Sequence, residues 1–144
     1  MKRMFNKAFT IMEILIVVII VGIIAGFSIP NYRKANESAY ERDAVLQLST
    51  LHDAEQLYHA REGGLYWPPD TTVYNVSQIN SALDTSLIEN GMTLTCTSPA
   101  AGGSAFTCTA QRAGGAFTLQ LDETTLGSGN PCCSAGNCPT LAGC

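Results

Sequence analysis

Residues 14–29 read ILIVVIIVGIIAGFSI, sixteen residues without a charge, and this stretch decides the fold. A helix over it rises about 24 Å, and the flanking residues 9–12 bring it close to the ~30 Å hydrocarbon core of a bilayer. Residues 1–8, near its N-terminal end, include three basic residues and no acidic one: Lys2, Arg3 and Lys7. Because basic residues flank the cytoplasmic end of a spanning helix, we expect one membrane-spanning helix over 9–30 with its N-terminus in the cytoplasm.

Two ordinary alternatives for this stretch are a secretory signal peptide and a plain signal anchor. A signal peptide has an apolar run of about 7–15 residues followed by a small-residue cleavage site, whereas this run is longer and continues into a helical pattern. Glu13 is unexpected in either, because a carboxylate in an apolar helix costs about 2.5–3.5 kcal/mol near the bilayer centre and less toward its edge. Glu13 therefore indicates a function that needs the charge.

Residues 8–18 read AFTIMEILIVV and follow a short basic leader. Phe9 precedes a threonine, a glutamate lies four residues after it, and the apolar run ends at Pro30. This pattern resembles the cleavage and methylation motif of type IV pilins and pseudopilins, and the resemblance extends through Tyr32. It implies that a prepilin peptidase cuts between Ala8 and Phe9 and methylates the new amine of Phe9.

Ala8 departs from the family's pattern, which strongly prefers glycine before the cut. Alanine has the next smallest side chain, so a subsite shaped for glycine accepts it more slowly, and we expect residues 1–8 to be removed as a leader. The resemblance also implies that Glu13 pairs with the amine of Phe9 in a neighbouring subunit during assembly. Such pairing relieves the penalty on an unpaired carboxylate in lipid.

Residues 31–62 are predicted to continue the helix as an amphipathic half. An apolar stripe recurs at helical intervals: Ala44, Leu48, Leu51 and Tyr58. Charged residues occupy other faces, among them Glu37, Glu41 and Arg42. Pro30 is expected to bend the helix without ending it, because the helical pattern resumes at once. Gly63 and Gly64 then stop a helix that begins near Phe9 and is about 80 Å long.

Gly22, Gly26 and Pro30 weaken the helix inside the apolar stretch, by about 1 kcal/mol for each glycine and about 3 kcal/mol for the proline. In lipid the helix has to persist, because free backbone groups find no water there. In a filament core, neighbouring helices and trapped waters can satisfy those groups. We therefore expect residues 22–30 to be helical in the monomer and partly melted in a filament.

Residues 63–91 are predicted to connect the helix to a sheet. They contain the aromatic–proline turn 66–70, and a short helix is expected over 77–83. Residues 92–122 hold three segments that alternate apolar and polar residues: 92–96, 106–111 and 117–122. Such alternation is typical of strands with one buried face, so we expect a three-stranded antiparallel meander packed on the helix stripe. Residues 123–144 are expected to form an irregular, cysteine-rich tail.

All six cysteines follow residue 95, and an even number confined to one region indicates disulfides and an oxidising compartment. Cys96 and Cys108 lie on the apolar faces of the first two strands. If Leu94 pairs with Ala110, Cys96 lies opposite Cys108. We therefore predict a Cys96–Cys108 disulfide, which closes a loop of about 12 residues and stabilises the fold by roughly 3 kcal/mol.

Four cysteines of the tail remain: Cys132, Cys133, Cys138 and Cys144. A bond between the adjacent Cys132 and Cys133 is disfavoured because it closes a small, strained ring. Two pairings stay open, namely Cys132–Cys138 with Cys133–Cys144, or the same cysteines with the partners exchanged. Zinc binding is a less favoured alternative, since no C-x-x-C pair is present and the domain faces an oxidising exterior.

His52, Glu55 and His59 are spaced to share one helix face and are the best candidates for a metal site. The favoured interpretation is a solvated helix face, so we expect no metal, no cofactor and no catalytic residue. No nucleophile motif accompanies the serines and histidines, and an enzyme is not expected. The net charge of −4 and the pI near 5.0 lack the basic signature of a nucleic-acid-binding protein.

Together these features predict an α+β fold, with a long N-terminal helix packed by a small three-stranded sheet and a disulfide-rich tail. The resemblance implies a type IV pilus subunit that polymerises into a helical filament for adhesion, motility or DNA uptake. Its partners are then further copies, the prepilin peptidase, the pilus assembly machinery and inner-membrane lipid. The subunit is expected in the inner membrane before assembly and in an extracellular pilus afterwards.

Two other functions stay open. A type II secretion pseudopilin or a minor pilin shares the N-terminal pattern, although six cysteines favour a surface-exposed pilin. A membrane-tethered extracytoplasmic binding module is the alternative from another class, and in such a protein Glu13 is a coincidence.

Overall fold

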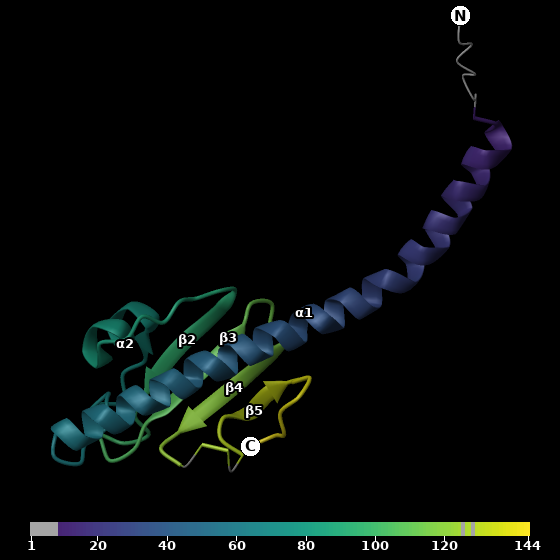
Figure 1. Ribbon diagram of the computed structural model, residues 1–144. Coiled ribbons are helices and arrows are strands. Elements are labelled where there is room, and N and C mark those ends of the chain that lie inside the picture. The colour runs from purple at the N-terminus through teal and green to yellow at the C-terminus, as the bar shows by residue number, and fades with distance from the viewer. Residues whose placement is uncertain (1–8, 125, 128) are drawn as a thin grey trace, which may run out of the picture. The chain divides into compact units, whose positions relative to one another are not determined.

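The computed structural model describes residues 9–124, 126–127 and 129–144. The chain divides into two compact units, one ending at Asn36 and the other spanning Glu37–Cys144. One long helix, α1 (Ile11–Arg61), begins in the first unit and continues in the second (Figure 1). The other described elements all belong to the second unit: β1 (Tyr74–Asn75), α2 (Val76–Leu83), β2 (Met92–Thr97), β3 (Thr107–Arg112), β4 (Phe117–Asp122) and β5 (Cys132–Gly136).

In the first unit, the backbone of α1 is helical through Gly22, Gly26 and Pro30. The helix begins at Ile11 and ends at Arg61, close to the predicted bounds. The cost of the two glycines and the proline is therefore overcome in the single chain. Partial melting of this segment in a filament stays a prediction.

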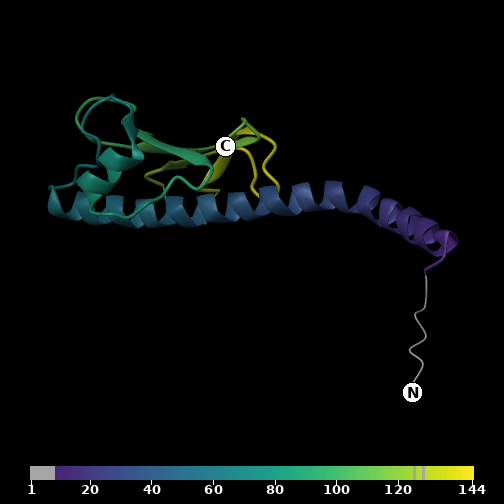
Figure 2. The same cartoon turned by 90° about the horizontal axis from the view of Figure 1, so that it is seen from above.

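The second half of α1 and the sheet form the two layers of the second unit (Figure 2). The predicted stripe of α1 faces the sheet, because Ala44, Leu48 and Leu51 are completely buried. The sheet contributes alternate residues of its three central strands to the same core: Met92, Leu94, Cys96, Cys108, Ala110, Phe117, Leu119 and Leu121. Burial of apolar surface from both layers is the main force that holds this unit together.

The sheet has five antiparallel strands in the order β1-β2-β3-β4-β5. The predicted meander forms its centre, and the predicted register is confirmed, with Leu94 opposite Ala110 and Cys96 opposite Cys108. The sheet is wider than the three strands predicted, because β1 and β5 pair with its two edges. Strand β5 lies in the tail that was expected to be irregular. Neither edge strand carries enough apolar alternation to indicate a strand.

The predicted short helix of the connecting segment is present as α2. Asn75 caps it, since its side chain accepts a hydrogen bond from the backbone N–H of Gln78 at 3.1 Å. The Gln78 side chain in turn accepts from the backbone N–H of Asn75 at 3.1 Å. This reciprocal capping box orients α2, and buried Ile79 and Leu83 join it to the core.

Candidate functional site

Thr10 caps the N-terminus of α1. Its hydroxyl oxygen accepts from the backbone N–H of Glu13 at 3.2 Å. Its carbonyl oxygen accepts from the backbone N–H groups of Glu13 at 3.1 Å and Ile14 at 3.3 Å. Thr10 and Glu13 have the T-x-x-E spacing of a capping box, and the helix dipole stabilises an acidic residue in the first turn. The residues after the predicted cut are therefore also a helix-start signal.

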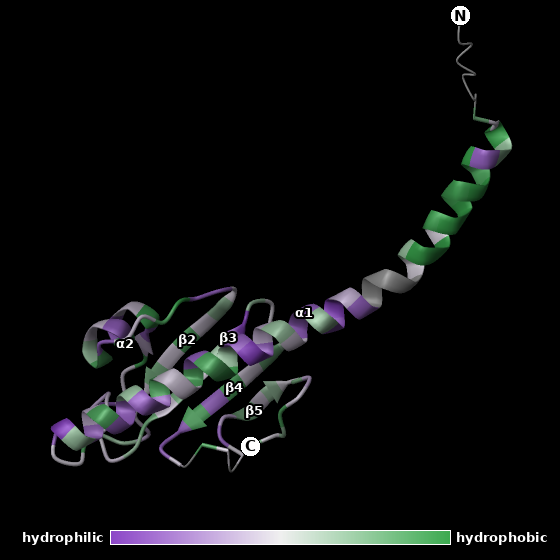
Figure 3. Cartoon of the chain, in the orientation of Figure 1, coloured by the Kyte–Doolittle hydropathy of each residue, from purple (hydrophilic) through white to green (hydrophobic). Residues whose placement is uncertain are grey.

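Residues 11–26 of α1 are exposed on all sides within their own chain. Figure 3 shows that this part of the helix is predominantly hydrophobic. Thirteen large apolar side chains between Phe9 and Ile24 are at least 50% exposed. A helix that is hydrophobic all round is typical of a buried or membrane-spanning segment and not of a surface helix in water. Within the described part of the chain, α1 is the one helix long and apolar enough to cross a membrane. The stretch therefore needs lipid or other chains around it.

Phe9 and Glu13 lie at the start of this stretch. Phe9 is 75% exposed. Among the described residues, no side-chain partner is present for the Glu13 carboxylate. Ala8, before the predicted cut, lies outside the described residues, so cleavage stays a prediction, as does the pairing of Glu13 with an amine. The structure thus presents an apolar helix start with one unpaired carboxylate.

Glu41 is a buried anchor for the C-terminal segment. Its carboxylate accepts from the backbone N–H of Thr140, at 3.1 and 2.9 Å to its two oxygens, and from that of Leu141 at 3.0 Å. The sequence prediction puts Glu41 on a face away from the apolar stripe. This is wrong, because Glu41 lies three and seven residues before Ala44 and Leu48 and is buried on the same side of α1. Sequence reasoning missed this contact because the partners lie 99 and 100 residues further along the chain.

His52 and Glu55 are buried, so the interpretation of a solvated helix face is wrong for both. Glu55 Oε2 accepts from the backbone N–H of Trp67 at 3.0 Å. Its Oε1 has no hydrogen-bond partner among the described residues. Burial raises the pKa of Glu55 to about 8, and the hydrogen bond from Trp67 opposes this shift only in part. Glu55 is therefore mostly protonated at neutral pH and fastens the aromatic–proline turn to α1.

The other two candidates for a metal site have separate roles. His52 Nε2 lies 3.0 Å from the carbonyl oxygen of Thr124. His59 stacks on Tyr66, with 4.3 Å between the ring centroids. In the described ranges, no three His, Cys, Asp or Glu side chains are grouped to hold a metal ion. The three residues thus join α1 to loops of the second unit.

Three disulfides include all six cysteines. The first joins β2 to β3 as predicted. In the tail, Cys132 pairs with Cys144 and Cys133 with Cys138, which is the second of the two pairings left open by the sequence. The N–H of Cys133 donates to Ala142 at 2.8 Å and the N–H of Cys144 to Cys133 at 3.1 Å, so the segment of Cys144 runs beside β5.

Comparison with curated proteins gives three informative similarities. The chain is 33% identical to the type IV major pilin protein PilE of Neisseria gonorrhoeae over 76 residues, which are 53% of this chain and 44% of that protein. It is 30% identical to PilE1 of the same organism over 102 residues, 67% of this chain and 55% of that one. It is 37% identical to the type II secretion system core protein G of Vibrio cholerae over 59 residues, 40% of each chain.

The chain therefore spans about half the length of these relatives, or less. No protein-family model matches the chain, and no solved structure matches it.

Proposed function

This chain belongs to the type IV pilin and pseudopilin family, and we propose that it is a pilus subunit that polymerises through the N-terminal part of α1. The family is structural and non-enzymatic. One observation carries the proposal. An apolar helix start that bears one carboxylate and is exposed on all sides continues into a folded unit closed by three disulfides. Such a chain suits a polymer in which copies cover one another's helices.

Two environments cover the apolar stretch in turn. Before assembly, inner-membrane lipid surrounds it, and the second unit lies outside the cytoplasm, where disulfides persist. The peptidase removes residues 1–8, after which Glu13 pairs with the amine of Phe9 in a neighbouring subunit. In the pilus, other copies replace lipid around the helix. Burial of apolar surface stabilises the polymer by about 25 cal/mol per Å² relative to water, which makes an extracellular filament cohesive.

A second candidate is a type II secretion pseudopilin or a minor pilin. The 37% identity to the Vibrio cholerae core protein G supports it, whereas the two Neisseria gonorrhoeae relatives support a major pilus subunit. A membrane-tethered binding module is the remaining alternative, and in that protein Glu13 has no assigned role. The disulfides of the second unit favour a subunit that is exposed outside the cell.

Fractionation of cells that produce this chain tests the proposal. We expect the chain to be the dominant protein of fibres sheared from the cell surface. Mass spectrometry of those fibres should find a methylated N-terminus at Phe9 and oxidised cysteines. If the chain makes up only a minor share of the fibres, the minor pilin is supported instead. If it forms short assemblies that stay at the membrane, the pseudopilin is supported. Recovery only as single anchored copies contradicts a filament subunit.

A further inference from the structure

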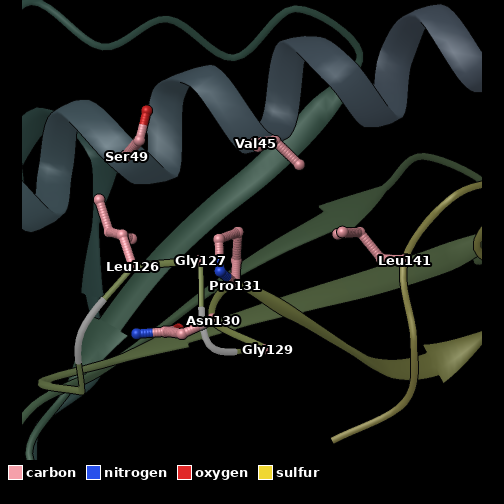
Figure 4. A pocket seen from close by; sticks show the side chains of 8 residues that line it. All are labelled: Val45, Ser49, Leu126, Gly127, Gly129, Asn130, Pro131 and Leu141. Atoms are coloured by element: carbon pink, nitrogen blue, oxygen red, sulfur yellow. The ribbon is translucent and has the colours of Figure 1, made fainter.

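An apolar groove runs along α1 beside the segment that follows β5. Figure 4 shows its first part, a hollow of ≈ 310 Å³ between Val45 of α1 and residues Pro131 and Leu141. A second hollow of ≈ 370 Å³ adjoins the first and shares Val45 and Leu141 with it. We call the combined hollow the α1–tail groove, and six residues define it: Arg42, Val45, Leu46, Pro131, Thr140 and Leu141.

The tail wall of the α1–tail groove is held in a fixed position. The Glu41 carboxylate accepts hydrogen bonds from the backbone of Thr140 and Leu141. Cys138 and Cys144, which flank these residues in sequence, are each tied by a disulfide. A surface whose shape is fixed in advance loses little conformational freedom when it binds, so the groove is preorganised for a ligand.

Two residues of the groove are exposed to solvent. Leu46 is 66% exposed. Arg42 is also exposed, and it has no ion-pair or hydrogen-bond partner among the residues that the structure describes. An apolar hollow with an unpaired cation at its rim favours an apolar ligand that carries one negative charge.

The start of α1 has this chemistry. Glu13 is the one charged residue between positions 9 and 30, and large exposed apolar side chains surround it in the sequence. We propose that the α1–tail groove binds the first turns of α1 from a second copy of this chain, with Arg42 paired to Glu13 of that copy. This inference rests on the proposed function and names the surface on which the incoming helix docks.

The proposed contact joins two different surfaces of the chain. Each copy offers one groove and one helix start, and a head-to-tail contact that does not close on itself produces a helical polymer. The guanidinium of Arg42 can donate two parallel N–H groups to a carboxylate, which offsets the cost of removing Glu13 from water. An ionised carboxylate has room for several donors, so while Arg42 of one copy donates to Glu13, the amine of Phe9 in a further copy can donate to it as well.

Disulfide cross-linking between copies tests the docking. Met12→Cys is produced in one copy and Leu46→Cys in another copy in the same cells, and sheared filaments are then oxidised. A covalent dimer is expected, because Met12 adjoins Glu13 and Leu46 lines the groove. Leu57→Cys is the matched control, since Leu57 is 53% exposed on the same helix and does not line the groove. No dimer is expected with it.

The charge of Arg42 is tested separately. We expect Arg42→Glu to lower the yield of sheared filaments by about tenfold or more, because the new carboxylate repels Glu13. The amount of membrane-bound chain and its thermal unfolding should stay unchanged, since Arg42 has no partner within the described chain. Arg33→Glu is the matched control, because it makes the same charge change at an exposed residue of α1 outside the groove. It should leave the yield near normal.

The outcomes separate this inference from the proposed function. Suppose that filaments form but Met12→Cys cross-links to Leu57→Cys and not to Leu46→Cys. This result overturns the groove contact and leaves the proposed function as a pilus subunit unaffected. A normal yield with Arg42→Glu, or equal losses with Arg42→Glu and Arg33→Glu, does the same. Cross-linking of Leu46→Cys to a different protein identifies another occupant and also overturns the contact. If the unaltered chain forms no filaments, the proposed function itself fails.

Discussion

Glu13 has a local position at the start of α1 and, in the proposed function, an assembly role. It lies in the first turn of α1, where Thr10 caps the helix, and its carboxylate adjoins the apolar stretch. We expect Glu13→Ala to leave membrane insertion intact, because the change removes a charge from the edge of the bilayer. We expect it to abolish or sharply reduce filaments, because the cations of neighbouring copies lose their partner. Immunoblots of membrane and sheared fractions measure both effects, and normal filament yield contradicts the assembly role.

Ala8 sets the rate of the proposed processing. Ala8→Gly should speed or complete cleavage, since the peptidase subsite is expected to fit glycine best. Ala8→Leu should block cleavage and leave the full-length precursor in the membrane. Intact mass spectrometry of membrane-bound and filament-bound chains distinguishes these results. Filaments built from subunits that still begin at Met1 would show that cleavage is not required.

Glu55 makes the stability of the second unit depend on pH. Its pKa rises from 4.5 to about 8 on folding, so the folded chain binds the proton more tightly than the unfolded chain. The stabilisation is fully present below about pH 4.5 and is lost as the pH rises through about 8. Glu55→Gln keeps the shape and the bond to Trp67 but cannot titrate. The quantity to measure is therefore the midpoint temperature of thermal unfolding in detergent between pH 5 and 8. It should fall less steeply with rising pH for Glu55→Gln than for the unaltered chain.

Glu62→Gln is the control for this experiment, because Glu62 is exposed on the same chain segment. For Glu62→Gln, the midpoint temperature should change with pH as steeply as it does for the unaltered chain. Equal slopes for Glu55→Gln and the unaltered chain contradict a buried, protonated Glu55.

Single buried polar residues were the least predictable part of the molecule. Glu13 stood out in the sequence, because a charge beside an uninterrupted apolar stretch needs no structure to be noticed. Glu41 and Glu55 did not stand out, because each sits among other polar residues of an amphipathic helix. Their helical spacing from Leu48 and Leu51 puts both on the buried side of α1. Their partners, however, lie in a loop and a tail that fold back onto the helix, and no local pattern records that return.

At the scale of elements, the question for α1 is whether residues 22–30 stay helical in a filament. Its backbone is helical through Gly22, Gly26 and Pro30 in the single chain. In a filament, neighbouring helices and waters offer other partners to the weakened backbone groups, so we expect partial melting there. A filament map at side-chain resolution measures this directly. Continuous helical hydrogen bonding through Ile29 in that map contradicts the prediction.

Elements with a strong local pattern were predictable, and elements that depend on a partner were not. The three central strands alternate apolar and polar residues, so their positions, and the register of β2 with β3, followed from the sequence. By contrast, β1 has two residues and β5 is rich in small residues and cysteine. Both are strands only because a sheet edge is available to pair with them. The pairing of the tail cysteines likewise depended on the backbone path of the tail.

At the scale of the whole molecule, the disulfides are expected to contribute according to the loops they close. Cys96–Cys108 spans 12 residues and Cys133–Cys138 spans 5. Replacing Cys96 and Cys108 together by alanine should lower the free energy of unfolding by about 3 kcal/mol. Replacing Cys133 and Cys138 together should lower it by about 2 kcal/mol. Urea unfolding of the two double variants measures which of them loses more free energy of unfolding. A larger loss for the Cys133 and Cys138 variant contradicts the loop-length argument.

The turn between β3 and β4 and the disulfide-bonded tail differ in how well they tolerate inserted sequence. Residues 113–116 are exposed, and a Cβ atom added at Gly114 or Gly115 would meet no other heavy atom within 4 Å. Loop tips of this kind tolerate inserted sequence best, whereas the tail uses its backbone groups on Glu41 and β5. An epitope or an affinity peptide is therefore best spliced into the turn. In the proposed filament each subunit then presents one copy, and the fibre becomes a scaffold that displays the peptide at a regular spacing.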